Sequence, residues 1–310
     1  ETLQELATYH RNQLTIPIIG ITGTNGKTTS KELINVILNS EKSCYATKGN
    51  LNNHIGVPLS ILGINNKHDI AIIEMGANHQ KEIEFLCNIS KPTHGTITNI
   101  GSAHLEGFGN PQGVIKTKNE LYEHLHENNG IAFVNSNDEL LVDLSKNLGR
   151  STYGTQGDCL GEITKHTPFI SINFHDIDIN SKLIGGYQFN NIMLAICIGE
   201  FFGISDRNIK TAIEKDSLIE DKELELNIDQ VSKDVKIVVD DKQLVDQVLI
   251  QAIKNTLKHG FDNDHKKVKL SFSSQKEKID GTFQIISSEI SEGFQLFYEA
   301  LNHPKFSKTE

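Results

Sequence analysis

The chain has 310 residues, a length that favours two domains. Hydrophobic residues make up 37% and charged residues 23%, a balance that is typical of a packed core and excludes wholesale disorder. The formal net charge of −10, without a long block of like charge, argues against a nucleic-acid-binding surface. No apolar run reaches the roughly 18 residues that span a bilayer, so we expect no membrane insertion.

The four cysteines are widely spaced along the chain: Cys44, Cys87, Cys159 and Cys197. They form no CxxC pair and have no metal-ligand spacing, so they are typical of reduced thiols in a cytoplasmic protein. The chain starts at Glu1 inside a helical pattern, and we therefore expect a fragment of a longer protein. We also expect a monomer.

The first 135 residues alternate short apolar runs with helical stretches. The expected strands cover 16–21, 70–74, 96–100 and 131–134, and the expected helices between them cover 27–39, 80–87 and 112–127. Runs that are nearly continuous in apolar residues are typical of strands buried on both faces. The pattern therefore predicts an α/β fold with a doubly wound parallel sheet.

Residues 150–184 contain short extended pieces with turns, and helices are expected over 190–202 and 206–214. The acidic stretch 216–225 is typical of a linker. We therefore expect one domain over 1–216 and a smaller α+β domain over 217–310. The second domain is expected to contain a strand at 235–240, an amphipathic helix at 243–258, and strands at 267–273 and 282–287.

A glycine-rich loop separates the first strand from the first helix. It reads Gly23-Thr24-Asn25-Gly26-Lys27-Thr28-Thr29. Glycines let backbone N–H groups turn toward an anion, and the helix N-terminus adds its partial positive charge. Lys27 would reach terminal phosphates and the Thr28 hydroxyl would ligate Mg²⁺, although Ile21 stands where GxxxxGK[ST] requires its first glycine. The alternative is a glycine-rich turn without a ligand.

Further polar side chains follow the neighbouring strands, and in open α/β sheets ligands gather at the carboxyl ends of strands. Glu74 ends the second expected strand, where it could hold the nucleotide's Mg²⁺ or cap the next helix. Asn99 and His104 follow the third strand, and His104 is either a metal-site residue or a structural histidine.

Lys118 lies on the apolar face of the helix expected over 112–127, which Lys116 does not share. One interpretation is a lysine whose stem covers apolar surface while its charge reaches water. The other is a partly buried lysine with a lowered pKa that can react or be modified.

Several strings resemble the Mur ligase family over about residues 1–215. They are GITGTNGKTTSKEL (20–33), GNLNNHIGVPLSIL (49–62), IIEMGANHQKEI (72–83), ITNIGSAHLEGFG (97–109), KTKNELYE (116–123) and LIGGYQFNNIMLAI (183–196). GNLNN and EMGANH are more similar to the branch that adds D-alanyl-D-alanine to a UDP-MurNAc-tripeptide than to branches that add single amino acids.

The resemblance implies ATP-dependent amide formation in peptidoglycan precursor synthesis, with UDP-MurNAc-peptide and D-Ala-D-Ala as substrates and ATP and Mg²⁺ as cofactors. A peptide carboxylate attacks the γ-phosphate, and an amine then displaces phosphate from the acyl phosphate. It implies these site residues: Lys118, His104 and Lys27 for catalysis; Gly23 to Thr29, Asn99 and Asn191 for ATP; Thr28, Glu74, His104 and carbamylated Lys118 for metal; and Asn52, Asn53 and His54 for substrate.

The sequence departs from the family pattern in three regions. The family's N-terminal UDP-binding domain has no counterpart, and the C-terminal strings NNRSQ and DxYNANP are absent. Tyr187 and Gln188 also replace the first two residues of the HNxxN motif that ends at Asn191. We therefore expect poor ligase turnover from this chain, and the alternative function is a nucleotide-binding module without ligase activity.

Residues 224–273 weakly resemble the ATP-binding module of histidine kinases, with Asn255 in the position of its Mg²⁺ ligand. The DxGxG box of that module is missing. The alternative is a plain amphipathic helix with Asn255 on its solvated side.

Overall fold

The computed structural model describes residues 2–101, 108–166, 169–183 and 185–215, together with three strands between 235 and 283. The chain divides into two compact units, Glu1–Asp221 and Lys222–Glu310, and each is described by itself. The expected linker at 216–225 and helix at 243–258, with Asn255, lie outside the described residues. The expected domain boundary stays a prediction, and so do the two interpretations of the helix expected over 243–258.

A seven-stranded parallel sheet forms the centre of the first unit, in the order β2-β3-β1-β4-β5-β6-β7. The strands are β1 (Ile18–Thr22), β2 (Cys44–Ala46), β3 (Ile70–Glu74), β4 (His94–Ile97), β5 (Ile131–Asn135), β6 (Gly149–Gly154) and β7 (Cys159–Leu160). Every residue of β1 and β3 is buried, as the continuous apolar runs predict. The expected doubly wound parallel sheet is confirmed.

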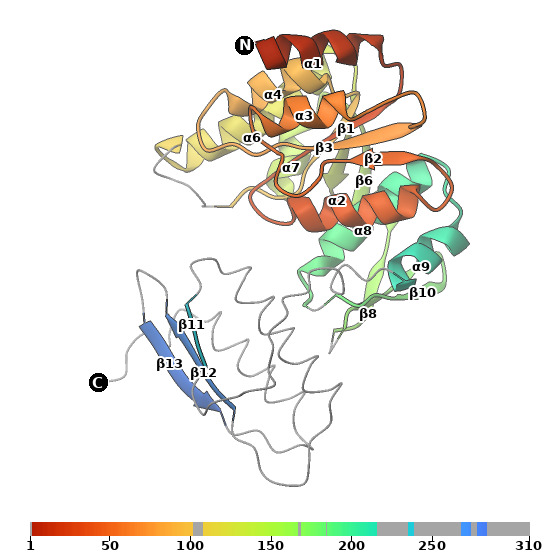
Figure 1. The fold of residues 1–310 in the computed structure, drawn as a ribbon. Helices are drawn as coiled ribbons and strands as arrows, with labels where there is room; N and C mark the ends of the chain where they lie inside the picture. Colours follow the sequence, from red (N-terminus) through yellow and green to blue (C-terminus); the bar gives the residue numbers. More distant parts are fainter. Residues whose placement is uncertain are drawn as a thin grey trace. The chain divides into compact units, whose positions relative to one another are not determined.

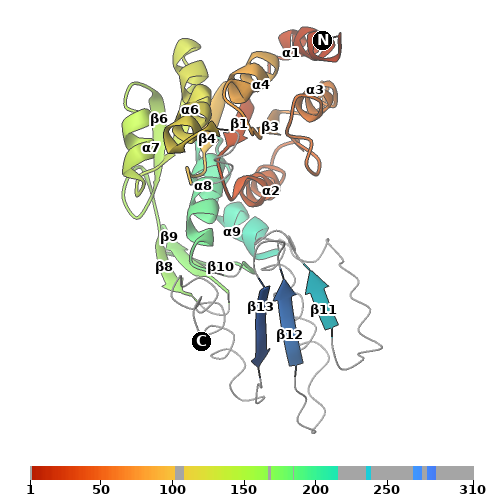
Figure 2. The same ribbon diagram turned by 90° about the vertical axis from the view of Figure 1, so that its left-hand side faces the viewer.

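Helices cover both faces of this sheet (Figures 1 and 2). One face carries α1 (Thr2–Gln13), α3 (Gly56–Leu62), α4 (Glu82–Ser90), α6 (Pro111–Glu127) and α7 (Glu139–Leu144). The other carries α2 (Lys27–Leu38), α8 (Gln188–Phe201) and α9 (Asp206–Lys215). Alternate strand residues serve the two cores: Ile18 packs with the first set of helices, whereas Ile19 packs with the second.

A small antiparallel sheet in the order β10-β9-β8 follows the central sheet along the chain. Its strands are β8 (Glu162–Lys165), β9 (Ser171–Phe174) and β10 (Ile177–Asn180). They correspond to the short extended pieces expected there. Among the described residues, no helix is both long and apolar enough to cross a bilayer.

The second unit contains a three-stranded sheet of β11 (Val235–Val238), β12 (Val268–Ser273) and β13 (Lys278–Phe283). The strand expected over 282–287 is wrong in position, because β13 begins at Lys278 and pairs antiparallel with β12 from Ser273↔Lys278 to Val268↔Phe283. The pairing with β12 therefore begins four residues earlier than the apolar residues alone indicate.

Candidate functional site

The glycine-rich loop lies between the end of β1 and the start of α2 and curls around the Lys27 ammonium. Lys27 Nζ donates to the backbone oxygens of Gly23, at 2.8 Å, and Thr24, at 3.1 Å. Gly23 and Gly26 have φ angles of 143° and 80°, which side chains rarely allow. Burial lowers the pKa of Lys27, and the nearby Glu74 carboxylate opposes that shift.

The segment that follows β4 braces this loop from one side. Asn99 bonds Asn25 in both directions: its side-chain oxygen accepts from the Asn25 N–H at 3.0 Å, and its amide nitrogen donates to the Asn25 carbonyl at 2.9 Å. Thr24 donates its N–H to the Asn99 carbonyl and accepts from the Gly101 N–H. Asn99 therefore lies against the loop and holds its shape, and its contact with ATP stays a prediction.

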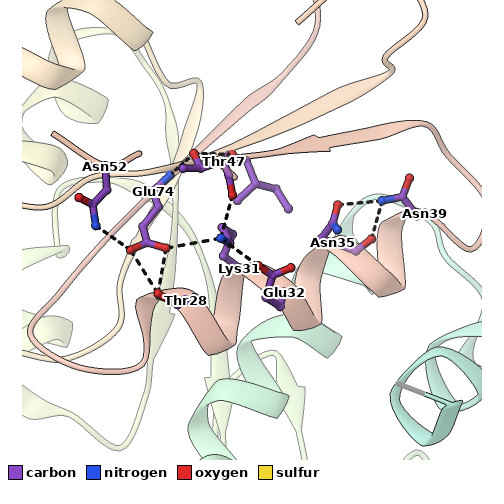
Figure 3. A network of polar contacts seen from close by, with 9 residues as sticks. Thr28, Lys31, Glu32, Asn35, Asn39, Thr47, Asn52 and Glu74 are labelled. Atoms are coloured by element: carbon purple, nitrogen blue, oxygen red, sulfur yellow. Dashed lines mark hydrogen bonds and ion pairs between the residues drawn. The ribbon is translucent and has the colours of Figure 1, made fainter. Parts of the chain in front are cut away.

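Glu74, at the end of β3, faces the first turn of α2 (Figure 3). The Thr28 hydroxyl lies 3.1 and 3.3 Å from the two carboxylate oxygens, to which it donates. The Asn52 side-chain nitrogen donates to Glu74 Oε1 at 3.0 Å. Since Glu74 is buried and bonded to these side chains, it does not serve mainly as a helix cap.

Two residues of this network, Lys31 and Thr47, were not predicted from the sequence. Lys31 Nζ donates to the Thr47 carbonyl at 2.8 Å and lies 2.9 Å from Glu32 Oε1 and 3.8 Å from Glu74 Oε2 (Figure 3). The available signal was spacing, because a residue three positions after Thr28 lies on the same helical face. Thr47 gave no local signal, since its contact with Glu74 joins neighbouring strand ends.

A cavity of about 380 Å³ opens beside the glycine-rich loop. Its walls come from four parts of the chain: Gly23, Thr24 and Lys27; Asn52, Asn53 and His54; Gly76, Ala77, Asn78, Glu82, Phe85 and Leu86; and Phe108, Val114 and Lys118. The fold therefore brings the expected phosphate-loop lysine, the expected substrate residues and Lys118 to one hollow.

Lys118 lies on the inward face of α6, with only 4% of its surface exposed, whereas Lys116 on the same helix is exposed. Its ammonium is 5.7 Å from the centre of the Phe108 ring. Burial, and secondarily the charge of Lys27, lower the pKa of Lys118 to about 8. This geometry agrees with the partly buried lysine and not with one that reaches out to water.

Asn191 lies on α8 directly against the loop. Its side-chain oxygen accepts from the Ser30 hydroxyl at 3.1 Å, and its nitrogen donates to Gln188 Oε1 at 2.8 Å. A Cβ atom at Gly26 would come within 2.6 Å of Asn191 Oδ1. Asn191 is therefore a support of the loop, and its contact with adenine stays a prediction.

The remaining expected metal residue, His104, lies outside the described residues. Within the described parts of the chain, no three His, Cys, Asp or Glu side chains form a group that could hold a metal ion. Thr28 and Glu74 supply a hydroxyl and a carboxylate, and Mg²⁺ in phosphate sites commonly uses one or two carboxylates, with waters and substrate phosphates completing the shell. The donor set therefore fits a nucleotide-bound Mg²⁺.

The Mur ligase middle domain matches residues 21–199, more than half of the chain. The chain belongs to the Mur ligase family. This match covers the phosphate loop, the cavity and Lys118, so the family assignment rests on the same residues as the site.

Relatives within the Mur ligase family agree with this match. The UDP-N-acetylmuramoyl-tripeptide–D-alanyl-D-alanine ligase of Bacillus subtilis is 33% identical over 209 residues, which are 66% of this chain and 45% of the relative. MurF from Acinetobacter baumannii superposes with a TM-score of 0.62 at 31% identity, covering 69% of this chain and 49% of that one. The Thermotoga maritima MurF ligase, solved in complex with ADP, gives a TM-score of 0.59 at 30% identity, covering 68% and 51%.

The chain therefore spans about half the length of the curated relatives it matches. The similarity concerns the part that contains the phosphate loop and the central sheet.

Proposed function

We propose that this chain carries the ATP-binding part of a ligase that joins D-alanyl-D-alanine to UDP-MurNAc-tripeptide. The observation that supports it best is the single hollow that Lys27, Lys118 and the segment Asn52–His54 share beside the Thr28–Glu74 pair. A phosphate donor and a peptide acceptor could meet in such a cavity, and the Bacillus subtilis relative is named as a ligase of this kind.

Each residue near the loop has a role that follows from its place. Lys27 would leave the carbonyls of Gly23 and Thr24 to contact terminal phosphates, while backbone N–H groups at the start of α2 hold the phosphate chain. Thr28 and Glu74 would hold Mg²⁺, which neutralises phosphate charge during transfer. Asn99 and Asn191 would keep the loop in shape beneath the nucleotide.

Lys118 would be carbamylated: its neutral amine would add to CO₂ and release a proton, and the carbamate would act as a carboxylate in the cavity. Carbamate formation needs a neutral amine, and a lysine with a pKa of about 8 supplies far more of that form near neutral pH than an exposed lysine. By the resemblance, His104 would join Thr28 and Glu74 around the Mg²⁺.

The tripeptide carboxylate would attack the γ-phosphate of ATP, with ADP as the leaving group. The amino group of D-Ala-D-Ala would then displace phosphate from the acyl phosphate and lose a proton. Asn52, Asn53 and His54 line the cavity where the peptide would lie, and Asn52 also donates to Glu74. Free cysteines and an ATP-consuming reaction support a reducing, cytoplasmic location.

The first experiment measures Mg·ADP binding by titration calorimetry in the parent, in Lys27→Ala and in the control Lys48→Ala. Lys48 is exposed on the loop that follows β2, so the loss of its side chain should leave Mg·ADP binding unchanged. Lys27→Ala should abolish binding while the circular dichroism spectrum stays that of the parent. Unchanged affinity in a folded Lys27→Ala protein contradicts the proposal.

The second experiment measures phosphate release from ATP with UDP-MurNAc-tripeptide and D-Ala-D-Ala added singly and together. Release that needs both substrates supports the ligase. Hydrolysis that ignores both substrates supports the alternative of a nucleotide-binding module without ligase activity.

A further inference from the structure

Lys31 is a buried cation that the proposed reaction does not use. It lies on α2 one turn beyond Lys27, and its side chain is 0% exposed. A lysine buried to this extent requires partners for its charge and its three N–H donors. Figure 3 shows those partners converging from α2, from Thr47 after β2, and from Glu74 at the end of β3.

The contacts of the Lys31 ammonium divide into two kinds. Its short bonds go to the Thr47 carbonyl, at 2.8 Å, and to Glu32 Oε1, at 2.9 Å. The distance to Glu74 Oε2 is 3.8 Å, which is too long for a hydrogen bond but close enough for strong attraction. Lys31 therefore gives Glu74 a counter-charge without occupying either of its oxygens.

Those oxygens instead accept from Thr28 and Asn52, which are weaker partners that can be exchanged. Thr47 reinforces the arrangement, because its hydroxyl accepts the Glu74 backbone N–H at 3.0 Å while its carbonyl holds Lys31. The backbone and the side chain of Glu74 are thus both tied to the Lys31–Thr47 contact.

We propose that Lys31 is a positioning residue: it is the nearest counter-charge of the buried Glu74 carboxylate and holds that carboxylate in place before a divalent cation arrives. The inference rests on the proposed function only in taking that cation to be the Mg²⁺ of a nucleotide. Lys31 and Mg²⁺ then neutralise the same carboxylate, so the stabilisation that each one gives is smaller when the other is present.

The experiment compares melting temperatures in ADP with EDTA and in ADP with Mg²⁺, and takes the difference as the Mg²⁺-dependent gain. In Lys31→Met, Glu74 has lost its nearest counter-charge, so this gain should exceed that of the parent by about 2–4 °C. In Glu32→Gln, Lys31 has lost its nearest carboxylate and interacts more with Glu74, so the gain should be smaller than that of the parent. Glu32 is partly exposed, and this variant remains informative if Lys31→Met does not fold.

Lys67→Met, at an exposed lysine, is the control and should match the parent. A purely structural role, in which Lys31 only holds Thr47, predicts equal Mg²⁺-dependent gains in all variants, and that result would overturn the inference. The order Glu32→Gln, parent, Lys31→Met from smallest to largest gain supports it. A parent without any Mg²⁺-dependent gain would instead count against the proposed nucleotide site itself.

Discussion

Lys27 and Lys118 belong to helices on opposite faces of the central sheet, yet both line one cavity, and the charge of Lys27 helps to lower the pKa of Lys118. Two cations that face the same hollow repel each other until an anion enters. Their arrangement therefore favours a polyanionic ligand between them. With a pKa of about 8, Lys118 also changes its protonation state within a pH range that is easy to measure.

We expect Lys118→Met to stabilise the fold in a pH-dependent manner. The folded pKa of about 8 lies below the ordinary value of 10.5, so the unfolded chain binds the proton more tightly. Below pH 8 the folded state carries a buried charge, and its removal should raise the free energy of unfolding by on the order of 3 kcal/mol. Between pH 8 and 10.5 that gain should fade, because the folded lysine loses its proton first.

Urea unfolding at several pH values measures this effect, and Lys116→Met on the same helix is the matched control. Lys116 is exposed, so its substitution should change stability little at any pH. A gain from Lys118→Met that is independent of pH would show that packing, and not charge burial, determines it.

Gly26→Ala tests whether the loop depends on its contact with Asn191. Gly26 and Gly49 have φ angles of 80° and 53°, so alanine strains the backbone at both positions by about 1 kcal/mol. Only at Gly26 would the new Cβ meet an atom, Asn191 Oδ1 at 2.6 Å, because nothing lies within 4 Å of Gly49. We expect Gly26→Ala to lose Mg·ADP binding, and Gly49→Ala to keep it.

Calorimetric titration with Mg·ADP, together with urea unfolding of both variants, separates the effect of backbone strain from that of the steric clash with Asn191. Equal losses of affinity at the two glycines would contradict the role given to Asn191.

The sequence alone predicted the features that depend on neighbours along the chain. The buried runs at Ile18–Thr22 and Ile70–Glu74 are recognisable because both faces of each strand are apolar, and parallel strands bring Glu74 to the same edge as Thr28. The short edge strand Cys44–Ala46 was missed because its three half-buried residues lack such a run.

Contacts between segments far apart in sequence were harder to predict. Asn52 lines the cavity and its contact with substrate stays a prediction, but its side chain also donates to Glu74, and only the folded loop after β2 reveals that contact. In the sequence, Lys31 looks like an ordinary lysine on the surface of a helix. Its spacing from Thr28 indicates the same helical face, but its complete burial depends on the contact with Thr47 after β2, which no local pattern encodes.

Glu120 should stabilise the packing of α4 against α6, although the proposed reaction gives it no role. It is buried on α6, and its two oxygens accept the backbone N–H groups of Lys81, at 2.8 Å, and Glu84, at 2.9 Å. Glu120→Ala leaves both donors unpaired at the start of α4, so we expect a loss of about 3 kcal/mol in urea unfolding. Glu120→Gln keeps one acceptor and should lose less.

Glu123→Ala is the control for Glu120, since Glu123 is exposed one turn further along α6. Its effect should stay within about 0.5 kcal/mol. A Glu120→Ala protein as stable as Glu123→Ala would mean that water satisfies the start of α4.

Lys118→Ala combined with small carboxylic acids tests the proposed carbamate. The substitution empties a buried position on the cavity wall, next to the Phe108 ring. Since a carbamate would act there as a carboxylate, Lys118→Ala should lower substrate-dependent phosphate release by roughly 100-fold or more, as removal of one preorganised charge-stabilising group does.

Formate or acetate should enter the vacated space and restore part of the rate. Chloride at equal ionic strength should not, and Lys116→Ala should respond to neither salt. Full activity in Lys118→Ala would leave Lys118 as a packing residue of α6. A slow Lys118→Ala enzyme that no carboxylate rescues would mean that the amine itself, and not its carbamate, contacts the phosphates.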